Sequence, residues 1–116
     1  MSKHYTNTHE KYSRLADDLK AALECGKRAE EDVTDAGTPN FDAPSLYLPH
    51  WYGKEIKQAA RLAGTVAFEW THRDVRAWVF QPDTKGIANR RTVNAEAMTN
   101  ELRKRGYLAT TYYQMD

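Results

Sequence analysis

Residues 75–115 constrain the fold most, because they contain a strand, a loop, an amphipathic helix and a second strand in succession. The letters VRAWVF, from Val75 onward, carry apolar residues at both alternating sets of positions. This pattern predicts a strand that is central in a sheet or covered on both sides. Pro82 ends it, because proline lacks the N–H that a sheet ladder needs. We expect the stretch to form one β-α-β-like unit.

The helix of this unit follows a basic loop and precedes a glycine. Its apolar residues recur at three- and four-residue spacing, as Ala95, Met98 and Leu102. Thr92 or Asn94 is the expected N-cap. Gly106 is the expected C-terminal stop, because glycine adopts the left-handed conformation readily. Residues 108–115 are expected to form the last strand.

The N-terminal region predicts a long amphipathic helix. Asn7 and Glu10 have the spacing of a capping box. The buried stripe is expected to be Tyr12, Leu15, Ala16, Leu19, Ala22 and Leu23. The pattern leaves two ends open: a stop near Gly26, or continuation to Ala36 with Gly37 as the terminator.

Residues 37–50 hold three of the four prolines and show no helical period, so we expect an extended connection lying on the core. A second helix is expected from Lys54 to Ala63, ended by Gly64. Its inward residues are predicted to be Ile56, Ala59, Ala60, Leu62 and Ala63.

Residues 65–71 alternate as a half-buried strand, with Val66, Phe68 and Trp70 on one face. Residues 72–74 make the turn to the strand that begins at Val75. For that strand the sequence allows two alternatives for the set of residues that faces the core. One is Val75, Ala77 and Val79, and the other is Trp78 and Phe80.

These elements predict an α+β fold in one domain of residues 1–116, in the order α-α-β-β-α-β. The expected sheet has three strands, with the helices packed mainly on one face. Within the domain we expect a helical region at 7–36, a connection at 37–50 and an α-β-β-α-β core at 51–116. A hydrophobic content of 41% and a charged content of 28% are ordinary for such a chain.

The sequence also indicates a compartment. The single cysteine, Cys25, cannot form an internal disulfide, which favours a reducing cytoplasm. No apolar run approaches the roughly 18 residues of a membrane span. The first residues lack the apolar core of a signal peptide. We expect a cytoplasmic protein that does not contact the membrane.

The strongest charge feature is a basic window at residues 85–105, with six basic side chains against two acidic ones. Its basic members are Lys85, Arg90, Arg91, Arg103, Lys104 and Arg105. Lys85, Arg90 and Arg91 lead into a helix N-terminus, where backbone N–H groups and the helix dipole favour an anion. The window can attract phosphate or an acidic protein face, but it is too small to predict duplex DNA binding.

Two further features are candidate contact surfaces. Aromatic residues are numerous for so small a core, so some must lie at the surface, where they mark protein interfaces or base-stacking platforms. Trp51 or Tyr52 is the expected aromatic anchor. An acidic cluster of Glu30, Glu31, Asp32 and Asp35 is either a solvated face or a second contact surface.

One catalytic reading is available. Asp83-Thr84-Lys85, after a strand and before a helix, resembles the D-x-K element of PD-(D/E)xK nucleases. That resemblance implies a divalent metal held by two carboxylates, with the lysine activating water. The other carboxylate would be Glu69 or Asp74. Pro82 removes Asp83 from the strand ladder, so a proline-aspartate turn competes with this reading.

Other catalytic and metal chemistry is not indicated. The four histidines are scattered, and none has metal-ligand spacing with Cys25 or with another histidine. Neither a serine-nucleophile motif nor a glycine-rich phosphate loop is present. We therefore expect no cofactor and no resident metal, and favour a protein that is not an enzyme.

Several stretches resemble small proteins of unknown function from phages and conjugative elements. These are NFDAPSLYLP, TVAFEWTHRDVRAWVFQP, ANRRTVNAEAMTNELRKRGY and YYQMD, which cover most of residues 38–116. The resemblance assigns no catalytic residue. It implies an accessory protein that binds and blocks a host factor, as anti-CRISPR proteins do.

The leading hypothesis is a non-enzymatic protein that occupies a site on a host protein or nucleoprotein complex, such as a CRISPR effector. A nucleic-acid-binding module is the alternative, and the metal-dependent nuclease ranks third.

Overall fold

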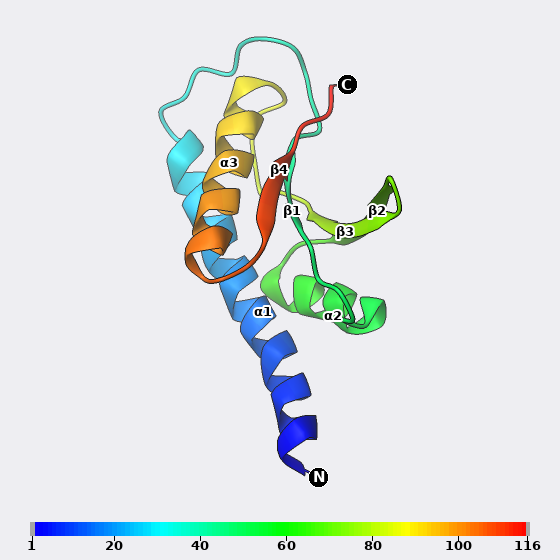
Figure 1. The fold of residues 1–116 in the computed structure, drawn as a ribbon. Coiled ribbons are helices and arrows are strands. Elements are labelled where there is room, and N and C mark those ends of the chain that lie inside the picture. The colour runs from blue at the N-terminus through cyan, green and yellow to red at the C-terminus, as the bar shows by residue number, and fades with distance from the viewer. Residues whose placement is uncertain (1, 116) are drawn as a thin grey trace.

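The computed structural model describes residues 2–115, with side chains from residue 9 onward, and consists of three helices and four strands (Figure 1). In chain order the elements are α1 (Ser2–Glu30), β1 (Ala43–Leu46), α2 (Gly53–Ala63), β2 (Ala67–His72), β3 (Val75–Phe80), α3 (Asn89–Lys104) and β4 (Ala109–Tyr112). The α+β class is confirmed, but the predicted element order lacked β1.

The four strands form one antiparallel sheet in the order β2-β3-β1-β4. From β1 onward the elements run β-α-β-β-α-β, which is the split β-α-β arrangement. The long helix α1 precedes this unit. β3 lies between β2 and β1, as the apolar residues on both of its faces predicted.

The expectation of a three-stranded sheet was wrong, because β1 lies within the segment predicted as a connection. β1 is a central strand despite Pro44. Tyr47 N donates to Leu108 O on the β4 side, so alternation directs the backbone N of Pro44 toward β3. The ladder between β1 and β3 begins only at Ser45, opposite Val79. Proline therefore removes no ladder hydrogen bond, which is why a central strand tolerates it.

α1 starts earlier and ends differently from both predictions. It begins at Ser2, so Asn7 lies within the helix and is not its N-cap; the Asn7 side chain lies outside the described side chains. The helix continues through Gly26 and ends at Glu30. Gly26 is buried against α3, where a Cβ would lie 2.0 Å from Asn94 Oδ1. The glycine thus allows two helices to approach closely and does not end one of them.

α2 and the following hairpin agree closely with the sequence. Gly64 has a φ of 94° and ends α2, with its N–H bonded to the last helical carbonyls. Arg73 and Asp74 have φ values of 50° and 66°, as a tight two-residue hairpin turn requires. The prediction that Leu62 of α2 faces inward was wrong. Leu62 is 69% exposed, because it lies on the outer side of the helix.

All three helices share one hydrophobic core with a single face of the sheet. Leu15 and Leu19 of α1, with Ile56 of α2, are fully buried in this core. The sheet contributes Leu46, Trp78 and Phe80, so the second of the two predicted inward faces of β3 is observed. The stripe Ala95, Met98 and Leu102 of α3 is buried as expected.

α3 begins earlier than predicted. Its first residue is Asn89 and its N-cap position is Ala88, so neither Thr92 nor Asn94 caps it. No side chain of the cap residue satisfies the first backbone N–H groups. At the other end Gly106 has a φ of 99°, as expected for a C-terminal stop.

Gly26→Ala tests the contact between α1 and α3. Helix propensity alone would make alanine more stable by up to about 1 kcal/mol. Because the new Cβ overlaps the buried Asn94 side chain, we expect a net loss of about 2 kcal/mol or more in the free energy of unfolding, measured with urea.

Two controls accompany this measurement. Glu24→Ala, on the exposed side of the same helix, is expected to change stability little. In an Asn94→Ala background the cost of Gly26→Ala is expected to shrink, because the overlapping amide is gone. A stabilising Gly26→Ala would show that the two helices are not packed as described.

Candidate binding surfaces

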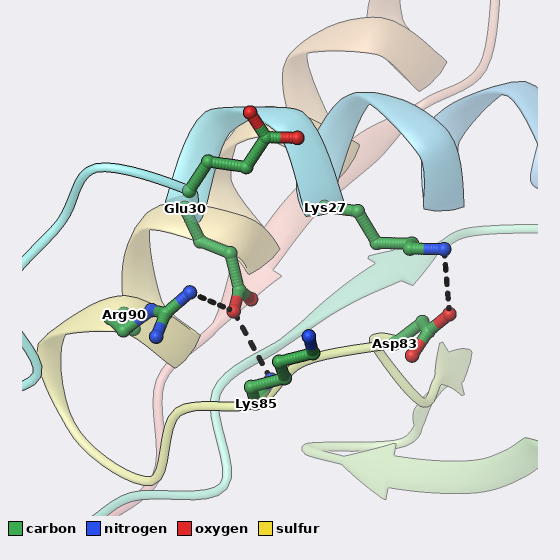
Figure 2. A pocket seen from close by; sticks show the side chains of 6 residues that line it. Lys27, Glu30, Asp83, Lys85 and Arg90 are labelled. Atoms are coloured by element: carbon green, nitrogen blue, oxygen red, sulfur yellow. Dashed lines mark hydrogen bonds and ion pairs between the residues drawn. The ribbon is translucent and has the colours of Figure 1, made fainter.

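We call Lys85, Arg90 and Arg91, the predicted basic residues before and at the start of α3, the basic junction. Its residues Lys85 and Arg90 lie against the C-terminal end of α1. A pocket there is lined by Lys27 and Glu30 of α1, by Glu31 directly after it, and by Asp83, Lys85 and Arg90 (Figure 2). Its cavity volume is about 130 Å³. Lys27 Nζ and Asp83 Oδ2 are 3.6 Å apart, and both side chains are about half exposed. The pocket therefore brings the acidic cluster and the basic loop into contact.

Glu30 is the centre of this contact and is only 3% exposed. Its Oε1 accepts a hydrogen bond of 2.7 Å from Asn94 Nδ2. Its Oε2 accepts from the backbone N of Lys85 at 3.1 Å, and lies 3.3 Å from Arg90 Nη2. Asn94 also donates to the carbonyl of Asp83. One carboxylate thereby joins α1, the loop and α3.

The environment of Glu30 favours its charged form. Burial raises the pKa of Glu30, but hydrogen bonds from Thr84, Asn94 and the Lys85 backbone N–H lower it, as does the Arg90 charge. The net pKa lies below its usual value. The carboxylate is therefore ionised at neutral pH, and its negative charge balances the positive charge of Arg90.

Asp35, from the loop after α1, caps α3. Its Oδ1 accepts hydrogen bonds from the backbone N of Ala88 at 3.0 Å and of Arg90 at 3.2 Å. Its Oδ2 accepts from Ile87 N at 2.9 Å. The Ile87 hydrogen bond contributes most to holding the pKa of Asp35 below its usual value. The sequence predicted that this helix start attracts an anion from a partner. In the structure a carboxylate of the chain itself, more than 50 residues away, occupies the position.

Arg91 is held by a different segment. Its Nε donates to the Asp42 carbonyl at 3.0 Å, and its guanidinium carbon lies 6.0 Å from the centre of the Phe41 ring. The buried Asp42 carboxylate accepts hydrogen bonds from Thr92 Oγ1 and from Gln114 N. Burial lowers the pKa of Arg91 more than Asp42 raises it. Arg91 thus lies on the side of α3 that adjoins β1.

The other predicted basic residues lie at the far end of α3. Arg90 and Arg105 are separated by about 22 Å along the helix axis. Arg105 contacts Asp18 at 2.9 Å and Glu101 at 2.8 Å, and the Glu101 hydrogen bond contributes most to raising its pKa. Arg103 donates to the Ala109 carbonyl. The six basic residues therefore do not form one surface patch.

Lys85 and Lys104 have exposed side chains, and neither makes an ion pair with a described residue. The Lys85 backbone N–H is bonded to the Glu30 carboxylate, and its side chain lines the pocket beside α1 (Figure 2). These two lysines lie at opposite ends of α3. Their side chains thus lack the internal ion pairs that hold Arg90 and Arg105.

The predicted aromatic anchors lie near the N-terminal end of α2. Trp51 packs partly on the core and makes an edge contact with Tyr12 at a centroid distance of 5.2 Å. Lys11 Nζ lies 4.6 Å from the centre of a Trp51 ring. Tyr52 is 69% exposed. Trp51 and Arg105 both line a groove of about 470 Å³, so two of the predicted contact residues are brought together there.

The residues that the nuclease hypothesis requires lie apart in the structure. Glu69 lies on β2, where it contacts Arg76 at 3.0 Å. Asp83 and Lys85 line the pocket beside α1. Asp74, the other suggested carboxylate, lies in the hairpin turn. Among the described residues, no cluster of three or more His, Cys, Asp or Glu side chains could hold a metal ion.

A surface that the sequence did not single out is the second face of the sheet. The register places Phe68, Val79, Ser45 and Thr110 in one row across all four strands. The same face carries Trp70, Ala77, Ala43 and Tyr112. The helices pack on the opposite face, so this one is open (Figure 1).

The open face carries large apolar side chains. Phe68 is 52% exposed, Trp70 41% and Phe41 51%. The Trp70 and Tyr112 rings contact each other across the face at a centroid distance of 5.1 Å. We define the open-face groove as the hollow of about 310 Å³ lined by Phe41, Ala43, Phe68, Glu69, Trp70, Val79, Gln81, Arg91, Tyr112 and Gln114.

The alternation of apolar residues in 65–71 predicted part of the open face. It grouped Val66, Phe68 and Trp70 on one face of a half-buried strand, but the face that packs on the core is the other one, and Phe68 is 52% exposed. The sequence could not show which face the helices cover, because β1 was not recognised. Arg91 is the one member of the predicted binding set that lines the open-face groove.

Comparison with protein-family models, with curated proteins and with solved structures finds no match to this chain. Within residues 2–115, none of the helices is both long and apolar enough to cross a membrane.

Asp35→Ala tests the cap on α3. Because three backbone N–H groups lose their acceptor, we expect a lower urea midpoint and faster amide exchange at residues 87–91. Asp32→Ala is the matched control, since Asp32 is an exposed member of the same acidic cluster. Equal effects of the two substitutions would contradict a specific cap.

Glu30→Gln tests the buried carboxylate. An amide NH₂ would face a donor, either Asn94 Nδ2 or the Lys85 N–H, so we expect a cost of about 2 kcal/mol at neutral pH. Since the pKa of Glu30 is lowered by folding, the stability that it contributes is present above about pH 4.5 and is lost as the pH falls below that value. Urea unfolding is therefore expected to show the largest difference between wild type and variant near neutral pH, and a smaller one in acid. A constant difference would argue against an ionised Glu30.

Proposed function

We propose that the protein is a non-catalytic binding domain that docks on a partner protein through the open face of its sheet. The observation that carries this proposal is the open-face groove and its aromatic rim. An antiparallel sheet with one face in water is expected to carry polar side chains there. Here Phe68, Trp70 and Tyr112 occupy those positions. Exposed apolar patches of this kind are typical of interaction sites.

The charge distribution favours a protein partner over a nucleic acid. Arg91 is the one basic side chain among the residues that line the groove, and Glu69 lies in the same lining. Binding to a nucleic acid backbone usually requires several cations along the path of the phosphates. Arg90 and Arg105, which could have contributed, already contact carboxylates of the chain itself.

Several stretches that cover most of residues 38–116 resemble phage and conjugative-element proteins, and this resemblance is the basis for the kind of partner that we propose. The domain would occupy a site on a host protein or nucleoprotein complex and block it. A CRISPR effector is the most specific example of such a target. No catalytic step is needed for inhibition of this kind, because occupancy alone is sufficient.

A capture experiment tests the proposal. Tagged wild-type protein and a Phe68→Ser/Trp70→Ser variant are incubated with a bacterial lysate, and bound proteins are quantified by mass spectrometry. Both side chains are exposed, so the variant is expected to remain folded. Loss of two aromatic anchors is expected to reduce the captured partner by about tenfold or more.

Leu62→Ser is the matched control, because Leu62 is also a large, exposed apolar residue but lies on α2. It is expected to capture the partner as the wild type does. Parallel samples treated with nuclease separate the two partner classes. Capture that survives the double substitution, or that is lost after nuclease treatment, would contradict docking of a protein on the open face.

A further inference from the structure

Arg91 gives the open-face groove a positive charge that Asp42 offsets only in part. The side chain lines the groove, and its guanidinium carbon lies 6.0 Å from the centre of the Phe41 ring, within reach of a cation–π contact. Its Nε is bonded to the Asp42 carbonyl. In the part of the chain that the structure describes, its two Nη atoms have no hydrogen-bond acceptor. Arg91 is therefore fixed at one nitrogen and presents the other two to an incoming group.

The nearby carboxylates are already engaged. Glu69 also lines the groove, but its Oε2 lies 3.0 Å from Arg76 Nη1. The Asp42 carboxylate accepts from Thr92 Oγ1 at 2.7 Å and from Gln114 N at 2.8 Å. Asp42 offsets part of the Arg91 charge through space only. A planar guanidinium with two free nitrogens matches the geometry of a carboxylate.

We propose that the open-face groove recognises a segment of the partner protein in which a carboxylate lies beside an aromatic or large apolar side chain. The carboxylate binds the Nη atoms of Arg91. The apolar side chain packs among Phe68, Trp70 and Tyr112, whose rings form the adjoining wall. This inference rests on the proposed docking function and specifies the chemistry of the partner.

The groove itself argues for this occupant. A single accessible cation suits one carboxylate, whereas a nucleic acid strand needs several cations along its backbone. The aromatic wall and the arginine are adjacent, since Phe41 and Arg91 contact each other and Tyr112 lines the same hollow. Both binding elements are thus within reach of one short peptide segment.

Small probes test the pairing of charge and ring. Isotope-labelled full-length protein is titrated with indole-3-acetate, which has a ring and a carboxylate, and with indole-3-acetamide, which has the same shape without charge. The Trp70 indole N–H and the Arg91 Nε–H are followed by NMR. We expect both signals to shift, with indole-3-acetate binding about tenfold more tightly than the amide.

Arg91→Gln is expected to remove the preference for the acetate while leaving the Trp70 shift. Arg28→Gln is the matched control, because Arg28 is an exposed arginine on α1; the preference is expected to persist in it. If Arg91→Gln does not fold, Arg91→Lys is used. It keeps the charge but lacks the planar fork, so a clearly weakened preference is expected.

The possible results distinguish carboxylate recognition by Arg91 from the more general proposal that a partner docks on the open face. Equal binding of the acid and the amide at the open face would overturn the carboxylate preference and leave docking on that face intact. Shifts that map elsewhere, or no shift at millimolar probe, would count against both. Tighter binding of adenosine monophosphate than of indole-3-acetate would favour a nucleic acid. Concentration-dependent shifts of the open face without probe would favour a second copy of the chain.

Discussion

The structure depends most on the buried carboxylate of Glu30. It ends α1, holds the backbone of the loop at Lys85, accepts from Asn94 on α3 and neutralises Arg90. A buried carboxylate is costly unless it is paired and hydrogen-bonded, and here both oxygens are engaged. Asp35 adds the N-terminal cap of α3 from the adjacent loop. These contacts fix α3 beside α1 and so place the helical layer on one face of the sheet.

This arrangement shows that the basic residues at 85–105 have different roles and do not act as one binding surface. Arg90 and Arg105 each contact a buried carboxylate, Glu30 and Asp18 respectively, and serve the fold at opposite ends of α3. Arg91 differs, because only its Nε is used internally. The helices cover the face of the sheet that carries Trp78 and Phe80, so the aromatic residues of the other face remain accessible. A cation and an apolar wall consequently meet on the open face.

Much of the local structure could be predicted from the sequence. The limits of α2, the β2–β3 hairpin and the inner stripe of α3 follow from periodicity and from the glycines that end the helices. β1 could not be predicted, because Pro44 normally argues against a central strand. Nor could the capping by Asp35: the helix dipole predicts an anion, but only the tertiary fold shows which one. The open-face groove was missed for the same reason, since it depends on which face α1 and α3 cover.

The central claim is that the partner binds the open face and not the basic junction. Site-specific photo-crosslinking tests it directly, with p-benzoylphenylalanine placed at Phe68 in one protein and at Lys85 in another. Both positions are exposed, and they lie on different surfaces of the molecule. The account predicts an efficient crosslink to the captured partner from position 68 and little or none from position 85. A crosslink from position 85 alone would contradict it.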